Sequence, residues 1–113
     1  MDKSNGDKPL NRDEVLQKAR SALEAAFPER FRGVVLYGSE ARGTARPDSD
    51  IDLLVLLDGP VRLGPDIDTA VEALYPLSLR LGRHISAMPV DAEEYESVEC
   101  PLYRAAHREG VTA

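Results

Sequence analysis

Apolar residues follow two different spacings along the chain, and the changes of spacing mark the expected helices and strands. From Val15 to Ala26 they recur every three or four residues, as on a buried helix face, and Pro28 should stop that helix. Asn11 followed by Glu14 is typical of a capping box at its start. The pattern predicts, in order, a helix at 12–27, a strand at 33–37, a short helix or turn at 39–43, a strand at 50–57, a helix from 66, a strand from 83 or 84 to 90, a short helix at 92–96 and a helix at 101–109.

Proline and glycine refine these boundaries. Gly59-Pro60 and Gly64-Pro65 should bracket a loop, and Pro76 should kink or end the helix that begins at residue 66. Pro89 indicates a sheet edge or a strand end, whereas the strand at 50–57 is apolar on both faces and should be central. The alternation of helices and strands predicts an α/β (α+β) fold.

Composition and charge narrow the class of protein. The 113 residues, 42% of them hydrophobic, predict one domain at residues 11–113 after a disordered lead-in at residues 1–10. No apolar run has the roughly 20 residues of a membrane helix, and the start of the chain has no signal-peptide core. A single cysteine, Cys100, fits a reducing cytoplasm. The net charge of −6 argues against a nucleic acid partner, because broad binding to a nucleic acid backbone depends on neutralising phosphates with Lys and Arg.

Two carboxylates at the start of the central strand are the first candidate for chemistry. Alternate residues of a strand point to one face, so Asp50 and Asp52 should project side by side while Ile51 and Leu53 enter the core. Two like charges held this close repel each other unless a cation lies between them. Mg²⁺ suits such a pair, because it binds through one or two carboxylates together with substrate phosphates.

A glycine turn ten residues earlier supplies the second half of a candidate site. Gly38 leaves room for a phosphate to approach the backbone, and Ser39 adds a hydroxyl donor before a plausible helix start. Arg42 could add charge to the same anion, although a surface or packing role explains it equally well. An alternative without a ligand is also open, in which a polar loop joins two strands and the acids only end the second strand. That alternative explains Asp52 poorly.

These residues resemble a known signature. Gly38-Ser39, a spacer containing Ala41-Arg42-Gly43, and Ser49-Asp50-Ile51-Asp52-Leu53-Leu54-Val55 are similar to the motif of the minimal nucleotidyltransferases (MNT), within the DNA-polymerase-beta-like nucleotidyltransferase superfamily. The resemblance covers roughly residues 13–111 and implies a small mixed β-sheet with helices packed on it.

The resemblance also implies an activity and the residues that carry it. The expected reaction is Mg²⁺-dependent transfer of a nucleoside monophosphate, first of all AMP from ATP, to a hydroxyl of a protein or small molecule, with release of pyrophosphate. Asp50 and Asp52 would be the catalytic, metal-binding acids, and Gly38, Ser39 and Arg42 would bind the phosphates of ATP or another nucleoside triphosphate. The implied partner is a small helical HEPN-type protein, or further copies of this chain.

One position departs from the pattern of the family. In the expected register, Ser86 stands where a third acidic residue is usual, and His84 lies on the same side of the strand. A serine hydroxyl is a poor Mg²⁺ ligand, so catalysis should be slow even if nucleotide binding is intact. Two functions therefore stay open: an active nucleotidyltransferase, and a weakly active or inactive nucleotide-binding module that inhibits a partner protein as an antitoxin does.

Overall fold

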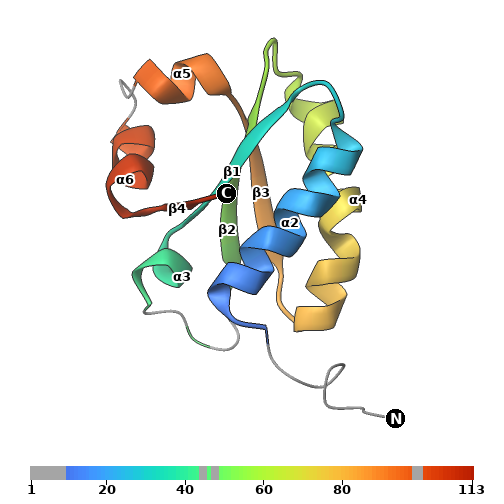
Figure 1. Cartoon of the computed structure of the whole chain (residues 1–113), viewed down its shortest axis with the longest axis vertical. Helices are drawn as coiled ribbons and strands as arrows, with labels where there is room; N and C mark the ends of the chain where they lie inside the picture. Colours follow the sequence, from blue (N-terminus) through green and yellow to red (C-terminus); the bar gives the residue numbers. More distant parts are fainter. Residues whose placement is uncertain (1–9, 44–45, 47–48, 98–100) are drawn as a thin grey trace.

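In the described part of the chain, residues 10–43, 46, 49–97 and 101–113, four strands form one mixed sheet of order β3-β2-β1-β4 (Figure 1). The strands are β1 (Phe31–Tyr37), β2 (Ile51–Leu57), β3 (Ile85–Asp91) and β4 (Val111–Thr112). β1 is antiparallel to β2 and to β4, and β2 is parallel to β3. The small mixed sheet, the central position of β2 and the edge position of β3 confirm the predictions.

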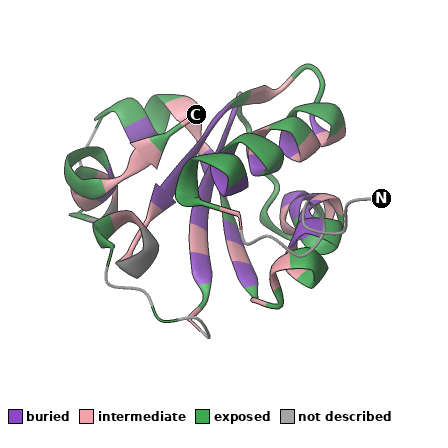
Figure 2. Ribbon diagram, turned by 60° about the horizontal axis from the view of Figure 1, so that its bottom comes forward, coloured by how far each residue is buried: buried purple, intermediate pink, exposed green. Residues whose placement is uncertain are grey.

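Helices cover both faces of the sheet. The helices are α2 (Arg12–Ala26), α3 (Ser39–Arg42), α4 (Leu63–Leu81), α5 (Ala92–Ser97) and α6 (Pro101–Glu109). Figure 1 shows α2 and α4 side by side on one side of the sheet and α5 and α6 on the other, with α3 near the end of β1. Figure 2 shows that burial is concentrated on the strands and on the sides of the helices that face them.

The two faces of β2 belong to two separate clusters of apolar side chains. Odd-numbered residues such as Ile51 and Leu53 are fully buried in the cluster that includes α2 and α4. Leu54 and Leu56 belong to the smaller cluster under α5 and α6. Because side chains alternate along a strand, Asp52 lies on the same face as Leu54, beyond the part of the sheet that α5 and α6 cover.

The start of α2 confirms the predicted capping box. The Asn11 side chain accepts a hydrogen bond from the Glu14 backbone N–H at 2.8 Å, and the Asn11 N–H donates to Glu14 Oε1 at 3.0 Å. The helix ends at Ala26, one residue earlier than expected. Of the expected lead-in only Leu10 is described, and it packs against the core.

α4 differs most from its prediction. It begins at Leu63, so Gly64-Pro65 lies in its first turn instead of a loop, and Pro76 does not end it. A proline in the first turn removes no hydrogen bond, because the N–H groups there have no partner within the helix. Pro76 does remove one, but the buried residues Leu74 and Leu77 pack into the core on either side of it and favour a continuous helix.

Three smaller features complete the comparison with the predicted elements. β1 begins at Phe31, two residues before the expected strand, and β2 begins at Ile51, one residue after it. β4 was not predicted, because a strand of two residues is too short to show alternation.

Two further expectations concern single features of the chain. Cys100 lies outside the described residues. Among the described residues, no helix is both long and apolar enough to cross a membrane.

Candidate active site

The two predicted acids lie where β2 enters the sheet, beside the start of β3. In the parallel register Asp52 is opposite Ser86, and the Ile51 N–H donates to the His84 carbonyl at 2.9 Å. Asp50 therefore lies next to His84, with 3.6 Å between Asp50 Oδ2 and His84 Nδ1. The register places Ser86 beside Asp52 as expected, so the residue next to the inner acid is neutral.

β1 closes the other side of Asp52. Tyr37 is opposite Asp52 in the antiparallel register, and the next residue, Gly38, has a left-handed backbone with φ of 76°. A Cβ at Gly38 would lie 2.8 Å from Asp52 Oδ2. Position 38 therefore requires glycine for two reasons: the left-handed backbone, and the Asp52 carboxylate that occupies the space of a Cβ.

α3 is a single helical turn that follows directly from Gly38. The Arg42 N–H donates to the Gly38 carbonyl at 3.1 Å and closes that turn. The Arg42 side chain reaches away to α6, where Nη1 lies 3.5 Å from Glu109 Oε1. This contact supports the packing role of Arg42, and its phosphate-binding role stays a prediction. Ser39 begins α3, but its side chain lies outside the described part of the structure.

The environment of Asp52 disfavours its ionised form. Burial raises the pKa of Asp52 above its ordinary value, the nearby charge of Asp50 raises it further, and His84 partly opposes this. Burial also raises the pKa of Tyr37, and the charge of Asp52 adds to the effect. Burial is the main cause of both shifts, and a bound cation would relieve the repulsion that adds to them.

The donor set fits a hard cation that brings further ligands with it. The carboxylates of Asp50 and Asp52 are oxygen donors, which Mg²⁺ prefers, and the neutral Ser86 beside Asp52 adds no further charge. Within the described residues, no group of three or more His, Cys, Asp or Glu side chains could hold a metal ion by itself. Such a metal would therefore be completed by water and by the phosphates of a nucleotide.

Two contributors to the site were not predicted. Tyr37 was predicted only as the last residue of the strand at 33–37, and its position opposite Asp52 depends on the strand register. Arg83 Nε donates to the Ser49 carbonyl at 2.8 Å and ties the residues before β2 to those before β3. The sequence does contain a signal for Tyr37, because it is the last strand residue before the glycine turn at Gly38. No signal in the sequence indicates the Arg83 contact.

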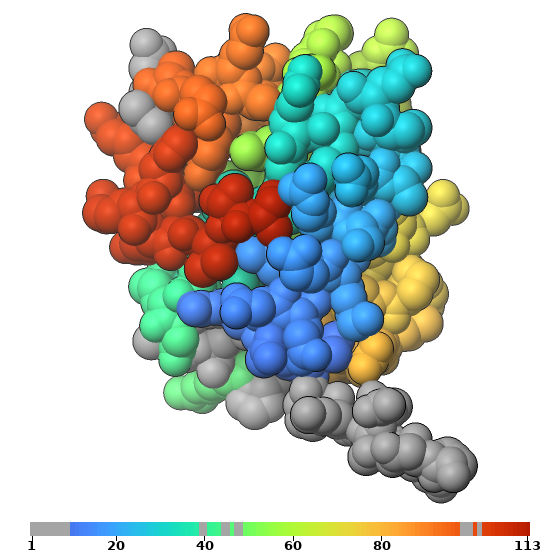
Figure 3. Space-filling view, viewed as in Figure 1, coloured from blue at the N-terminus to red at the C-terminus, as the bar shows by residue number. Residues whose placement is uncertain are grey.

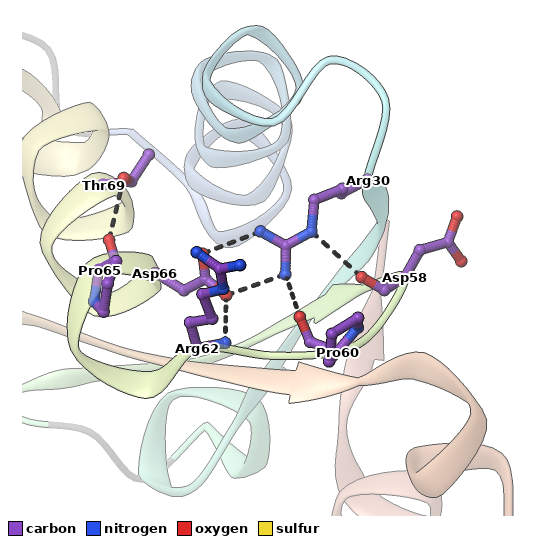
Figure 4. Close-up of polar contacts among 7 residues, drawn as sticks. All are labelled: Arg30, Asp58, Pro60, Arg62, Pro65, Asp66 and Thr69. Carbon is purple, nitrogen blue, oxygen red and sulfur yellow. Dashed lines mark hydrogen bonds and ion pairs between the residues drawn. The ribbon is translucent and has the colours of Figure 1, made fainter.

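A second polar cluster lies at the opposite end of the β1–β2 pair (Figure 4). Arg30 Nη1 and Nη2 donate to the two carboxylate oxygens of Asp66, each at 2.9 Å, and the Arg62 N–H donates to Asp66 Oδ2 at 2.9 Å. Arg30 also donates to the carbonyls of Asp58 and Pro60. These hydrogen bonds, led by those from Arg30, lower the pKa of Asp66. Three hydrogen bonds from within the chain satisfy the Asp66 carboxylate, which is typical of a structural cluster.

Comparisons with known proteins agree with this geometry. A sequence model of the family described as "nucleotidyltransferase domain" matches residues 16–110. A protein of Methanocaldococcus jannaschii named "Putative protein adenylyltransferase MJ0604" is 31% identical over 85 residues, which are 75% of this chain and 78% of that protein.

The fold is shared with solved structures, of which two are described here. A toxin-antitoxin structure with AMP-PNP has a TM-score of 0.62 and 21% identity, over 85% of this chain and 69% of that chain. A toxin-antitoxin structure of an MntA-HpeT mutant has a TM-score of 0.59 and 19% identity, over 92% and 72% of the two chains. At these identities the likeness confirms the predicted architecture, and the roles of individual residues depend on the site itself.

Proposed function

The chain belongs to the nucleotidyltransferase domain family, and from this premise we propose that it transfers AMP from ATP to a hydroxyl group of a protein. The observation that carries the proposal is the pair Asp50 and Asp52 beside the left-handed turn at Gly38. AMP and a protein acceptor are favoured because the relative from M. jannaschii is named a protein adenylyltransferase. A small-molecule acceptor is the alternative for the same chemistry.

Asp50 and Asp52 would hold Mg²⁺ together with the nucleotide. When bound, the metal would neutralise charge on the phosphates and polarise the bond that breaks. Gly38 gives the phosphates access to the backbone, and the turn after it would help hold the leaving group. The acceptor oxygen forms a bond to the α-phosphorus, the bond from that phosphorus to the bridging oxygen breaks, pyrophosphate leaves with the electron pair, and the hydroxyl proton is released.

A second function is favoured by one observation, the neutral Ser86 beside Asp52. With no third acid there, the chain could bind a nucleotide, turn it over slowly or not at all, and act by inhibiting a partner. The two solved structures described above are toxin-antitoxin structures, one of them with AMP-PNP. In this function the chain would resemble an antitoxin, and the partner would be a small helical protein of the HEPN type.

Label transfer separates the two functions. The protein is incubated with Mg²⁺, ATP labelled at the α-phosphate and the protein encoded by the neighbouring reading frame. We expect label on the acceptor, and a loss of about 100-fold or more in Asp50→Asn and in Asp52→Asn. Asp68→Asn, at an exposed position on α4, is the matched control and should transfer normally.

The outcome that favours the binding module is equally specific. Calorimetry would then detect Mg²⁺-dependent ATP binding that Asp52→Asn abolishes, while no acceptor carries label. If ATP binding were unaffected by both Asp50→Asn and Asp52→Asn, the nucleotide site proposed on β2 would be wrong for either function.

A further inference from the structure

The two acids of the candidate site are held by the sheet to different degrees. Asp52 lies within β2 and is paired with β1 on one side and with β3 on the other. Asp50 precedes the strand: the pairing of β2 with β1 ends at Asp52, and the pairing of β2 with β3 begins at Ile51. The Asp50 side chain is also 60% exposed, so packing does little to hold it. Contacts outside the sheet must therefore determine where the outer carboxylate lies.

Two consecutive residues before β3 supply such contacts. The Ser49 carbonyl accepts a hydrogen bond from Arg83 Nε at 2.8 Å. The Ile51 N–H donates to the His84 carbonyl at 2.9 Å. These two bonds hold the peptide groups immediately before and after Asp50. They restrict both backbone dihedral angles of that residue, although it lies outside the strand.

The two bonds differ in how they depend on the sequence. The His84 carbonyl belongs to the backbone, so any residue at position 84 could provide it. The bond to Ser49 comes from the side chain of Arg83 and is partly buried. The identity of residue 83 therefore decides whether the peptide before Asp50 is held.

Arg83 is itself fixed to the end of α4. Its N–H donates to the Ser78 carbonyl at 3.3 Å, and the Ser78 hydroxyl donates to the Arg83 carbonyl at 2.6 Å. α4 packs into the core through Leu74 and Leu77, and the space-filling view of Figure 3 shows its last turns (yellow to orange) beside the start of α2 (blue). A continuous set of contacts thus runs from the core to the outer acid.

We propose that Arg83 is a positioning residue for the metal-binding pair, which holds the peptide before Asp50 so that Asp50 and Asp52 present their carboxylates to one cation. This inference rests on the proposed function, because it concerns the Mg²⁺ and the nucleotide of that site. The Arg83 bond goes to a backbone carbonyl, so it occupies no carboxylate oxygen that the metal would use.

The expected consequence is a change in affinity. Without the Arg83 side chain, the backbone at Asp50 has more conformations, and only a fraction of them place its carboxylate beside Asp52. The apparent affinity of a ligand falls by the fraction of molecules that are ready to bind it. For the loss of one hydrogen bond from a charged donor, we expect a decrease of about threefold to tenfold.

Calorimetric titration of ATP into the full chain at a series of Mg²⁺ concentrations tests the inference. Arg83→Gln should raise the Mg²⁺ concentration at half-maximal ATP binding by about threefold to tenfold. Arg83→Lys keeps a positive donor and should show a smaller increase. Arg104→Gln removes the same charge at an exposed position on α6 and is the matched control, with no expected change.

A purely structural role of Arg83 gives a different result. It would lower the free energy of unfolding of Arg83→Gln and leave the Mg²⁺ midpoint of the folded protein unchanged. Circular dichroism identifies the folded variants. Ser78→Ala removes only the hydroxyl that fixes Arg83, and it should raise the midpoint by less than Arg83→Gln does.

The outcomes separate this inference from the proposed function. If Asp50→Asn raises the Mg²⁺ midpoint and folded Arg83→Gln does not, the positioning role is wrong and the nucleotide site stands. An equal increase in Arg104→Gln would assign the effect to lost charge and would also overturn the role of Arg83. If ATP binding is unaffected by Asp50→Asn and by Asp52→Asn, the site itself is wrong, and the inference fails with it.

Discussion

Two aspartates at opposite ends of the β1–β2 pair show how the same side chain serves two purposes. Asp66 accepts two hydrogen bonds from Arg30 and one from the Arg62 backbone, and these partners lower its pKa. Asp52 lies beside another acid, and burial raises its pKa. The first carboxylate is held by hydrogen bonds from the chain, whereas burial and the charge of Asp50 both disfavour the ionised form of the second.

This difference distinguishes structural acids from functional ones. A carboxylate that is buried and fully hydrogen-bonded stabilises the fold, whereas one that is buried beside a like charge costs stability in the absence of a ligand. Such a cost is expected where a site is arranged for binding or catalysis. Replacing each acid by its amide should therefore have opposite consequences.

The largest effect on stability is expected at Asp66. Asp66→Asn removes the charge that holds Arg30 and should lower the free energy of unfolding by about 2 kcal/mol. Asp52→Asn should leave that free energy unchanged or raise it, because the repulsion from Asp50 is lost. Chemical unfolding followed by circular dichroism in metal-free buffer measures both, with Asp68→Asn as the exposed control. A loss at Asp52 as large as at Asp66 would mean that Asp52 is a structural acid.

The next effect concerns the neutral neighbour of Asp52. If the missing third acid limits transfer, Ser86→Asp should increase the rate of Mg²⁺-dependent label transfer tenfold or more. A tenfold increase corresponds to an activation free energy that is lower by about 1.4 kcal/mol. Without metal the same variant should be less stable, because a third carboxylate joins the two already there. Ser97→Asp, at an exposed position on α5, controls for the added charge. Unchanged transfer with intact ATP binding would favour the binding module.

The arrangement of the candidate site could largely be predicted from the sequence, because it depends on the spacing of residues within single strands. Alternation along one strand is enough to place Asp50 and Asp52 on one face, and the paired position of Ser86 follows from aligning the ends of two strands. The apolar residues of β2 are likewise confirmed as a buried central strand. Patterns within a few residues determine each of these features.

The remaining features depend on contacts between distant segments. Asp66 was predicted only as the first residue of a helix, and its partner Arg30 lies 36 residues earlier. The extension of α4 past Pro76 is decided by packing in the core, which outweighs a local signal to stop. Tyr37 meets Asp52 through strand register alone. No short-range pattern contains this information.

Two glycines with the same backbone conformation allow a matched test of the space beside Asp52. Gly38 and Gly43 both have φ of 76°, but a Cβ at Gly38 would crowd Asp52 and one at Gly43 would have no neighbour within 4 Å. Alanine at either position should cost about 1 kcal/mol of stability from backbone strain. Only Gly38→Ala should also weaken Mg²⁺-dependent ATP binding, by about threefold to tenfold, because the carboxylate must move. Equal binding by both variants would show that the position of Asp52 does not matter for the nucleotide.

The smallest expected effect is the response of the two acids to pH. The pKa of Asp66 in the folded state lies below the unfolded value of about 3.9, so its stabilisation is present above that value and is lost as the pH falls through its folded pKa. The pKa of Asp52 is raised, so the folded state keeps the Asp52 proton up to a higher pH than the unfolded state does. Its contribution to the free energy of unfolding should therefore fall as the pH rises from about 3.9 through its folded pKa.

Unfolding curves in metal-free buffer test this difference in sign. Subtracting the curves of Asp66→Asn and Asp52→Asn from that of the unaltered chain isolates each acid, and the two differences should change with pH in opposite directions. Two slopes of the same sign would mean that Asp52 has partners within the chain as effective as those of Asp66. The repulsion at the start of β2 would then need no cation, and the electrostatic argument for a nucleotide-metal site there would be lost.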